Sequence, residues 1–128
     1  MRRNKHNVSP SEQRRSLGRT FDSKAEKEYA ERLQLLLDSG VIAEFNCQVP
    51  VHCLGCPENK FKPDFLVIPS PEDGRFPYYV EVKGFETPQW KTTKTLWEAY
   101  GRLELVVVKK RGKDFYEYET ITPKAMKP

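Results

Sequence analysis

Three residues have the types and spacing of a site that could bind a divalent cation and a phosphate. Asp64 directly precedes the apolar run at residues 65–68, and Glu81 and Lys83 alternate with valines in residues 78–83. Successive side chains of a strand point to opposite faces, so Glu81 and Lys83 would share one face. Carboxylates on neighbouring strands are oxygen ligands of the kind that Mg²⁺ or Mn²⁺ prefers. A lysine two residues further would supply positive charge where a phosphate could bind.

Glu26 is a fourth candidate. On a helix it would share a face with Ala30, Leu33 and Leu37, inside the apolar arc, where a carboxylate needs a partner. Ser23 and Glu26 also form a capping box, in which the glutamate bonds back to the N-cap N–H. Both roles can hold, since the first turn lies at the rim of a core.

The other three residues also have purely structural interpretations. Asp64 could cap the end of a hairpin, and Glu81 with Lys83 could form an ion pair on an exposed strand face.

The elements that must position these residues follow from periodicity and from start and stop signals. Apolar spacing between Ser23 and Gly40 predicts a helix, and Pro88 and Gly101 bound a second helix over residues 88–100. The segments that read as strands are residues 41–51, 61–68, 78–83 and 103–108. The short connection between the first two predicts an antiparallel hairpin, and the helix between the last two predicts a parallel crossover.

This order gives an α/β fold with an αβββαβ core, in which a mixed central sheet is flanked by helices. Residues 103–108 are apolar on both faces beyond Glu104, so that strand should lie inside the sheet. The alternating aromatic and acidic residues 115–121 fit an edge strand or a short helix, and the pattern does not choose between them.

The motif Pro63-Asp64, followed after 16 residues by Glu81-Val82-Lys83, resembles the PD-(D/E)XK signature of the restriction-endonuclease-like nuclease superfamily. Over about residues 20–110 the chain resembles small phage-encoded nucleases related to Holliday junction resolvases. The resemblance also rests on flanking residues: Phe21, Ser23, Lys24 and Glu26; residues 40–42; Gln48; Phe65; Gly84; Thr87; and Lys91.

The resemblance implies an Mg²⁺- or Mn²⁺-dependent DNA endonuclease that acts on branched DNA such as a four-way junction, in DNA recombination. Asp64, Glu81 and the Val82 carbonyl would bind the metal, Lys83 would act on the attacking water and the scissile phosphate, and Glu26 would be an accessory acid. Gln48 would lie near the active site, and Lys91 and Lys94 would contact the DNA backbone. Symmetric cutting of a junction needs two active sites, which implies a homodimer. The expected exposed interface residues are Phe115, Tyr116 and Tyr118.

The uneven charge of the chain is typical of a protein with an anionic partner such as nucleic acid, and a solubilising disordered terminus would explain it equally well. The chain has 128 residues and a net charge of +4, but residues 1–20 alone carry +5. We expect a flexible basic arm over residues 1–20 and a single nuclease domain over residues 21–128. The arginines of the arm would add affinity for the DNA backbone without reading sequence; they are Arg2, Arg3, Arg14, Arg15 and Arg19.

No apolar run approaches the roughly 20 residues of a membrane span, and no apolar segment follows the basic start. The expected location is a cytoplasm, that of the host cell if the protein is phage-encoded. We expect no membrane partner and no small-molecule cofactor.

Three alternatives stay open. The same chemistry could act on duplex, flap or single-stranded DNA, or a nuclease-like scaffold could bind DNA without cutting it. Cys53 and Cys56 form a C-x-x-C near His52 and Cys47, which raises a zinc site. On one continuous strand, however, Cys47 and Cys53 would lie about 20 Å apart, too far to share an ion.

Overall fold

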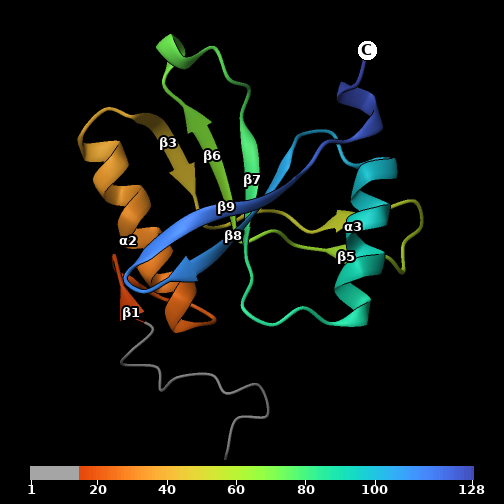
Figure 1. Ribbon diagram of the computed structural model, residues 1–128, viewed down its shortest axis with the longest axis horizontal. Coiled ribbons are helices and arrows are strands. Elements are labelled where there is room, and N and C mark those ends of the chain that lie inside the picture. Colours follow the sequence, from red (N-terminus) through yellow and green to blue (C-terminus); the bar gives the residue numbers. More distant parts are fainter. Residues whose placement is uncertain (1–14) are drawn as a thin grey trace, which may run out of the picture.

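The computed structural model describes residues 15–128 as a mixed five-stranded sheet between two helices (Figure 1). The strand order is β3-β6-β7-β8-β9. All neighbouring pairs are antiparallel except β7 and β8, which are parallel. The bounds are α2 Lys24–Asp38, β3 Ile42–Asn46, β6 Phe65–Pro69, β7 Tyr78–Val82, α3 Pro88–Tyr100, β8 Leu105–Arg111 and β9 Asp114–Ile121. The predicted α/β class, mixed sheet and parallel crossover are confirmed.

The two helices build separate cores on opposite faces of the sheet. Val80 packs in one buried cluster with Tyr29 and Leu33 of α2, whereas Val107 packs in another with Trp90 and Trp97 of α3. Strand residues alternate between faces, so Glu81, next to Val80, belongs to the α3 side. This alternation gives Glu81 and Lys83 the shared face that the sequence predicts.

Both helices begin at the residues that the sequence signals indicate. Ser23 Oγ accepts from the Glu26 N–H at 3.0 Å, and Thr87 Oγ1 accepts from the Trp90 N–H at 3.2 Å. Pro88 occupies the first turn of α3, where its missing N–H is not needed. Gly101 ends that helix, and a Cβ at this position would lie 2.7 Å from the Trp97 carbonyl oxygen.

The predicted strand over residues 41–51 is too long. β3 ends at Asn46, whose side-chain Oδ1 accepts from the Gln48 N–H at 2.8 Å and so turns the chain. Pro50 follows, and the next pairing is a separate ribbon of β4 (His52–Cys53) and β5 (Lys60–Phe61). The predicted strand over residues 61–68 is likewise broken at Pro63, so that Asp64 lies just before β6.

The ends of the chain differ from expectation as well. Residues 15–20 form a hairpin of β1 (Arg15–Ser16) and β2 (Arg19–Thr20), and Ser16 Oγ donates to Glu31 Oε2 of α2 at 2.7 Å. This part of the predicted arm therefore has regular structure, and the rest of the arm lies outside the described residues. Residues 115–121 belong to an edge strand, β9, which decides between the two options. Within the described residues, neither helix has the length and apolar character that a membrane crossing requires.

Replacing Ser23 with alanine should lower the free energy of unfolding by about 1 kcal/mol, because the Glu26 N–H loses its acceptor at the start of α2. Urea unfolding followed by circular dichroism measures this loss. Ser39→Ala at the other end of α2 is the matched control, since that exposed hydroxyl bonds only the Leu36 carbonyl. Equal losses in both variants would show that the Ser23 cap adds nothing specific.

Candidate active site

Asp64 is fixed against β7 by two hydrogen bonds. Its backbone N–H donates to the Val80 carbonyl at 3.0 Å, and its Oδ2 accepts from the Val82 N–H at 2.8 Å. β6 and β7 are neighbours in the sheet, with Phe65 opposite Val80. The carboxylate therefore lies beside the strand that carries Glu81 and Lys83, as predicted.

Glu81 is the one charged residue among the buried residues of the described chain, with a relative exposure of 7%. Among the described residues no N–H or hydroxyl group donates to its Oε1, its Oε2 lies 3.4 Å from Lys83 Nζ, and its carboxyl group also contacts that of Asp64. The Lys83 ammonium also lies over the Trp90 ring of α3, 4.4 Å from the ring centre. A buried carboxylate oxygen without a partner is costly, so this oxygen is available for a ligand.

Glu26 reaches the same cluster from the first turn of α2. Burial and the neighbouring carboxylates of Asp64 and Asp22 raise the pKa of Glu26 from 4.5 to about 8, although a bond from the Asp22 backbone opposes this rise. Glu26 and Asp64 line a cavity of about 110 Å³ together with Asp22, Cys47, Lys62 and Pro63. The bond to the Glu26 carboxylate comes from the Asp22 backbone and not from the N-cap residue Ser23, so only the Ser23 half of the predicted capping box is present, while Glu26 also lies beside Asp64.

The carboxyl groups of Asp64 and Glu81, like that of Glu26, have raised pKa values. Burial and the charge of Glu81 raise the pKa of Asp64 well above its usual 3.8. Burial raises the pKa of Glu81 to about 7, although Lys83 acts in the opposite direction. These shifts have the direction expected for carboxyl groups that are buried close to one another.

A divalent cation fits this donor set. The unpartnered oxygen of Glu81 and the carboxylate of Asp64 are hard oxygen ligands, and positive charge would relieve their repulsion. In the conformation described for residues 15–128, no three His, Cys, Asp or Glu side chains are grouped closely enough to hold a metal ion. The described cysteines form no such group for zinc either. Cys53 is exposed on the β4–β5 ribbon, whereas Cys47 lines the cavity beside Glu26 and Asp64.

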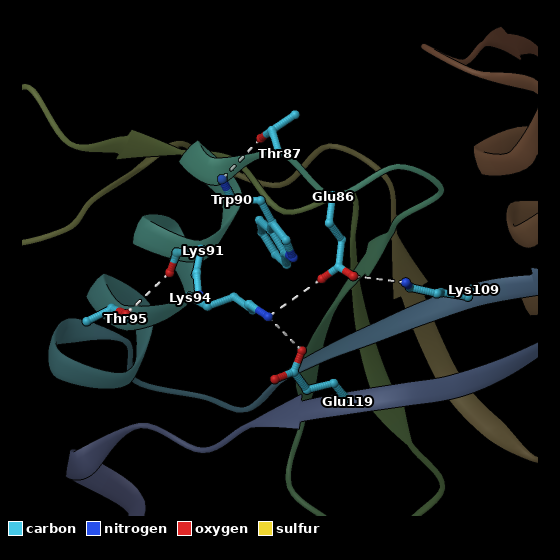
Figure 2. A network of polar contacts seen from close by, with 8 residues as sticks. All are labelled: Glu86, Thr87, Trp90, Lys91, Lys94, Thr95, Lys109 and Glu119. Atoms are coloured by element: carbon cyan, nitrogen blue, oxygen red, sulfur yellow. Dashed lines mark hydrogen bonds and ion pairs between the residues drawn. The ribbon is translucent and has the colours of Figure 1, made fainter.

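Lys94, predicted to contact DNA, is bound to carboxylates of its own chain (Figure 2). Its Nζ lies 3.1 Å from Glu119 Oε1 and 3.6 Å from Glu86 Oε1, and Glu86 Oε2 accepts from Lys109 Nζ at 3.0 Å. Lys91, one turn earlier on α3, is exposed. Of these two lysines, only Lys91 presents a charge that the described residues leave unneutralised.

The remaining predicted DNA contacts are only partly described. Gln48 is exposed just beyond the end of β3. Its neighbour in the chain, Cys47, lines the cavity that Glu26 and Asp64 share. Arg15 and Arg19 lie on β1 and β2, and their side chains are not described. Arg2, Arg3 and Arg14 lie outside the described residues.

Two features of the site are not predicted by the sequence. The apolar pattern places Trp90 only in the core of α3, yet its ring holds the Lys83 ammonium. The Glu86–Lys109 pair joins residues 23 positions apart, and no spacing rule predicts such a contact.

The prediction that Phe115 is an exposed interface residue is wrong, because Phe115 packs in the core beneath α2 and is only 9% exposed. Tyr118 is 48% exposed.

Comparison with known proteins finds no family model that matches this chain, and neither the curated proteins nor the solved structures contain a significant match.

Proposed function

We propose that this protein is a divalent-metal-dependent endonuclease that hydrolyses phosphodiester bonds in DNA, with a branched substrate such as a four-way junction. The observation that carries the proposal is Glu81: a buried carboxylate with one unpartnered oxygen, on the strand that binds Asp64, next to Lys83. The order α2, β3, β6, β7, α3 and β8 along the chain, interrupted by the β4–β5 ribbon, supports an αβββαβ core of the restriction-endonuclease-like kind.

Asp64 and Glu81 would hold the cation, with the Val82 carbonyl as a further ligand. When bound, Mg²⁺ or Mn²⁺ would offset the negative charge that develops on the phosphate during hydrolysis. The hydrogen bond from the Val82 N–H fixes Asp64 in advance, so little reorganisation is needed when the cation arrives.

Lys83 would act on the substrate. Its ammonium is directed by Glu81 and the Trp90 ring, which limits the positions it can take. From there it would orient the attacking water and offset charge on the scissile phosphate. Glu26 would act as an accessory acid next to Asp64, whose negative charge raises the pKa of Glu26.

A homodimer belongs to the proposal, because paired cuts across a junction need two active sites. Tyr116 and Tyr118 of the edge strand β9 are the remaining interface candidates. Their rings lie 6.4 Å apart, and Tyr118 is exposed.

A cleavage panel tests the function. Labelled four-way junction, flap, linear duplex and single strand are incubated with Mg²⁺ and with wild-type protein or Lys83→Ala. We expect paired symmetric cuts on the junction, lowered about 10²- to 10³-fold by the substitution. Lys124→Ala, an exposed lysine at the far end of the chain, is the matched control and should cut normally.

Each outcome of the panel has a distinct meaning. Cleavage of a substrate other than the junction would keep the nuclease and discard the junction specificity. Tight binding with no cleavage of any substrate would favour a DNA-binding protein built on a nuclease-like scaffold. Equal activity of wild type and Lys83→Ala would remove Lys83 from the mechanism.

A further inference from the structure

The end of β8 and the turn that leads into β9 form the most strongly basic segment of the described chain. Residues 109–113 read Lys-Lys-Arg-Gly-Lys, and we call them the basic hairpin. Gly112 has φ +62°, a left-handed conformation that suits a tight turn. Arg111 and Lys113 are exposed. Four cations within five residues repel one another, and negative groups, within the chain or on a partner, offset this repulsion.

The basic hairpin starts beside the candidate active site. Val82 pairs with Val108 across the parallel strands, and the Lys83 N–H donates to the Val108 carbonyl at 3.0 Å. Lys83 therefore shares a cavity of about 160 Å³ with the first residues of the hairpin; its lining includes Val82, Gly84, Lys109, Lys110 and Tyr116. Figure 1 shows this turn beside α2, away from the C-terminal end of the chain.

The four cations fall into two kinds. Lys109 is paired with Glu86 at 3.0 Å and Lys110 with Glu28, so these two anchor the hairpin to the body. Within residues 15–128, neither Arg111 nor Lys113 forms an ion pair.

Aromatic rings of β9 support the cations of the hairpin. The Arg111 guanidinium lies over the Tyr116 ring at 4.2 Å, and the Lys109 ammonium lies over Tyr118 at 3.9 Å. These contacts restrict the side chains without neutralising their charge, so less entropy is lost when Arg111 binds a ligand.

We propose that the basic hairpin is a binding site for the sugar-phosphate backbone of DNA. It holds the duplex arm that extends from the scissile phosphate on the Lys83 side, with Arg111 and Lys113 as the phosphate ligands. This inference rests on the proposed function, since it places the hairpin relative to a scissile phosphate. The contacts are to phosphates, so they position the DNA and read no sequence.

The double variant Arg111→Ala/Lys113→Ala tests this site through the salt dependence of binding. A short fluorescein-labelled duplex and a labelled four-way junction are titrated in EDTA, which prevents cleavage, at roughly 50 to 200 mM NaCl. Removing one phosphate-binding cation should lower the slope of log affinity against log salt by about 0.9, so the double variant should reduce the slope by about 2. The reduction should be the same for unrelated DNA sequences.

Two control variants make the result specific. Lys124→Ala/Lys127→Ala removes two exposed lysines after the other end of β9 and should leave the slope unchanged. Arg111→Lys/Lys113→Arg preserves both charges and should retain most of the slope. A slope that is unchanged in the alanine variant, or lowered equally in the Lys124/Lys127 control, would overturn the proposal.

Failure of this inference and failure of the proposed function look different. A normal slope in the hairpin variant, together with junction cleavage by the wild type, rejects the hairpin alone. A reduced slope without cleavage of any substrate supports the hairpin and rejects the nuclease. A wild-type protein that binds neither probe rejects both.

Discussion

Asp64→Asn and Glu81→Gln should each abolish DNA cleavage, with rates at least about 10³-fold below wild type, while DNA binding stays intact or becomes tighter. Each change removes a negative charge from the proposed metal ligands and keeps nearly the same volume. Asparagine can still accept the Val82 N–H bond through its amide oxygen, so the local backbone should hold. Less negative charge beside a phosphate also means less repulsion of DNA.

Single-turnover cleavage with Mg²⁺ and binding in EDTA, on the same labelled junction, separate these two effects. Asp38→Asn at the exposed end of α2 and Glu98→Gln on the exposed side of α3 are matched controls that should cut at wild-type rates. Loss of binding together with cleavage in both site variants would count against the metal-ligand roles of Asp64 and Glu81.

The bounds of the helices are predicted well because particular residue types favour the start and the end of a helix. α3 runs over the predicted residues 88–100, since Pro88 suits the first turn and Gly101 ends the helix where Trp97 leaves no room for a Cβ. The strand predicted over residues 41–51 is wrong beyond Asn46 because β-branched composition does not determine pairing. The chain leaves the sheet there, and the β4–β5 ribbon packs His52 and Phe61 against Trp97.

In the candidate site, too, local patterns predict some of the contacts, and the others depend on how the elements pack. Strand alternation is enough to place Glu81 and Lys83 on one face, and strand order is enough to place Asp64 beside them. The partners of Lys94 could not be predicted, because Glu119 lies 25 residues away and only the packing of α3 on the sheet brings them together. The prediction for Phe115 is wrong for a related reason, since the alternation in β9 does not say which face is covered by α2.

In the absence of divalent metal, the free energy of unfolding should fall as pH rises from about 5 to about 8. The folded protein raises the pKa of Glu26 from 4.5 to about 8 and that of Glu81 to about 7. Between these values the folded state keeps protons that the unfolded chain has released, so rising pH favours unfolding. Each proton that the folded state keeps and the unfolded chain has released contributes at most about 1.4 kcal/mol per pH unit.

Urea unfolding in EDTA at several pH values measures this slope, and Glu26→Gln should flatten it and stabilise the protein most at pH near 8. Glu98→Gln, an exposed control, should leave the slope unchanged. Mg²⁺ should stabilise the wild type more at pH near 8 than at pH near 5, because a cation binds the deprotonated carboxylates. A slope that is the same in wild type and Glu26→Gln would show that Glu26 does not hold its proton in the folded state. Equal Mg²⁺ stabilisation at both pH values would place the bound cation away from this cluster, because binding to carboxylates that titrate between these pH values must depend on pH.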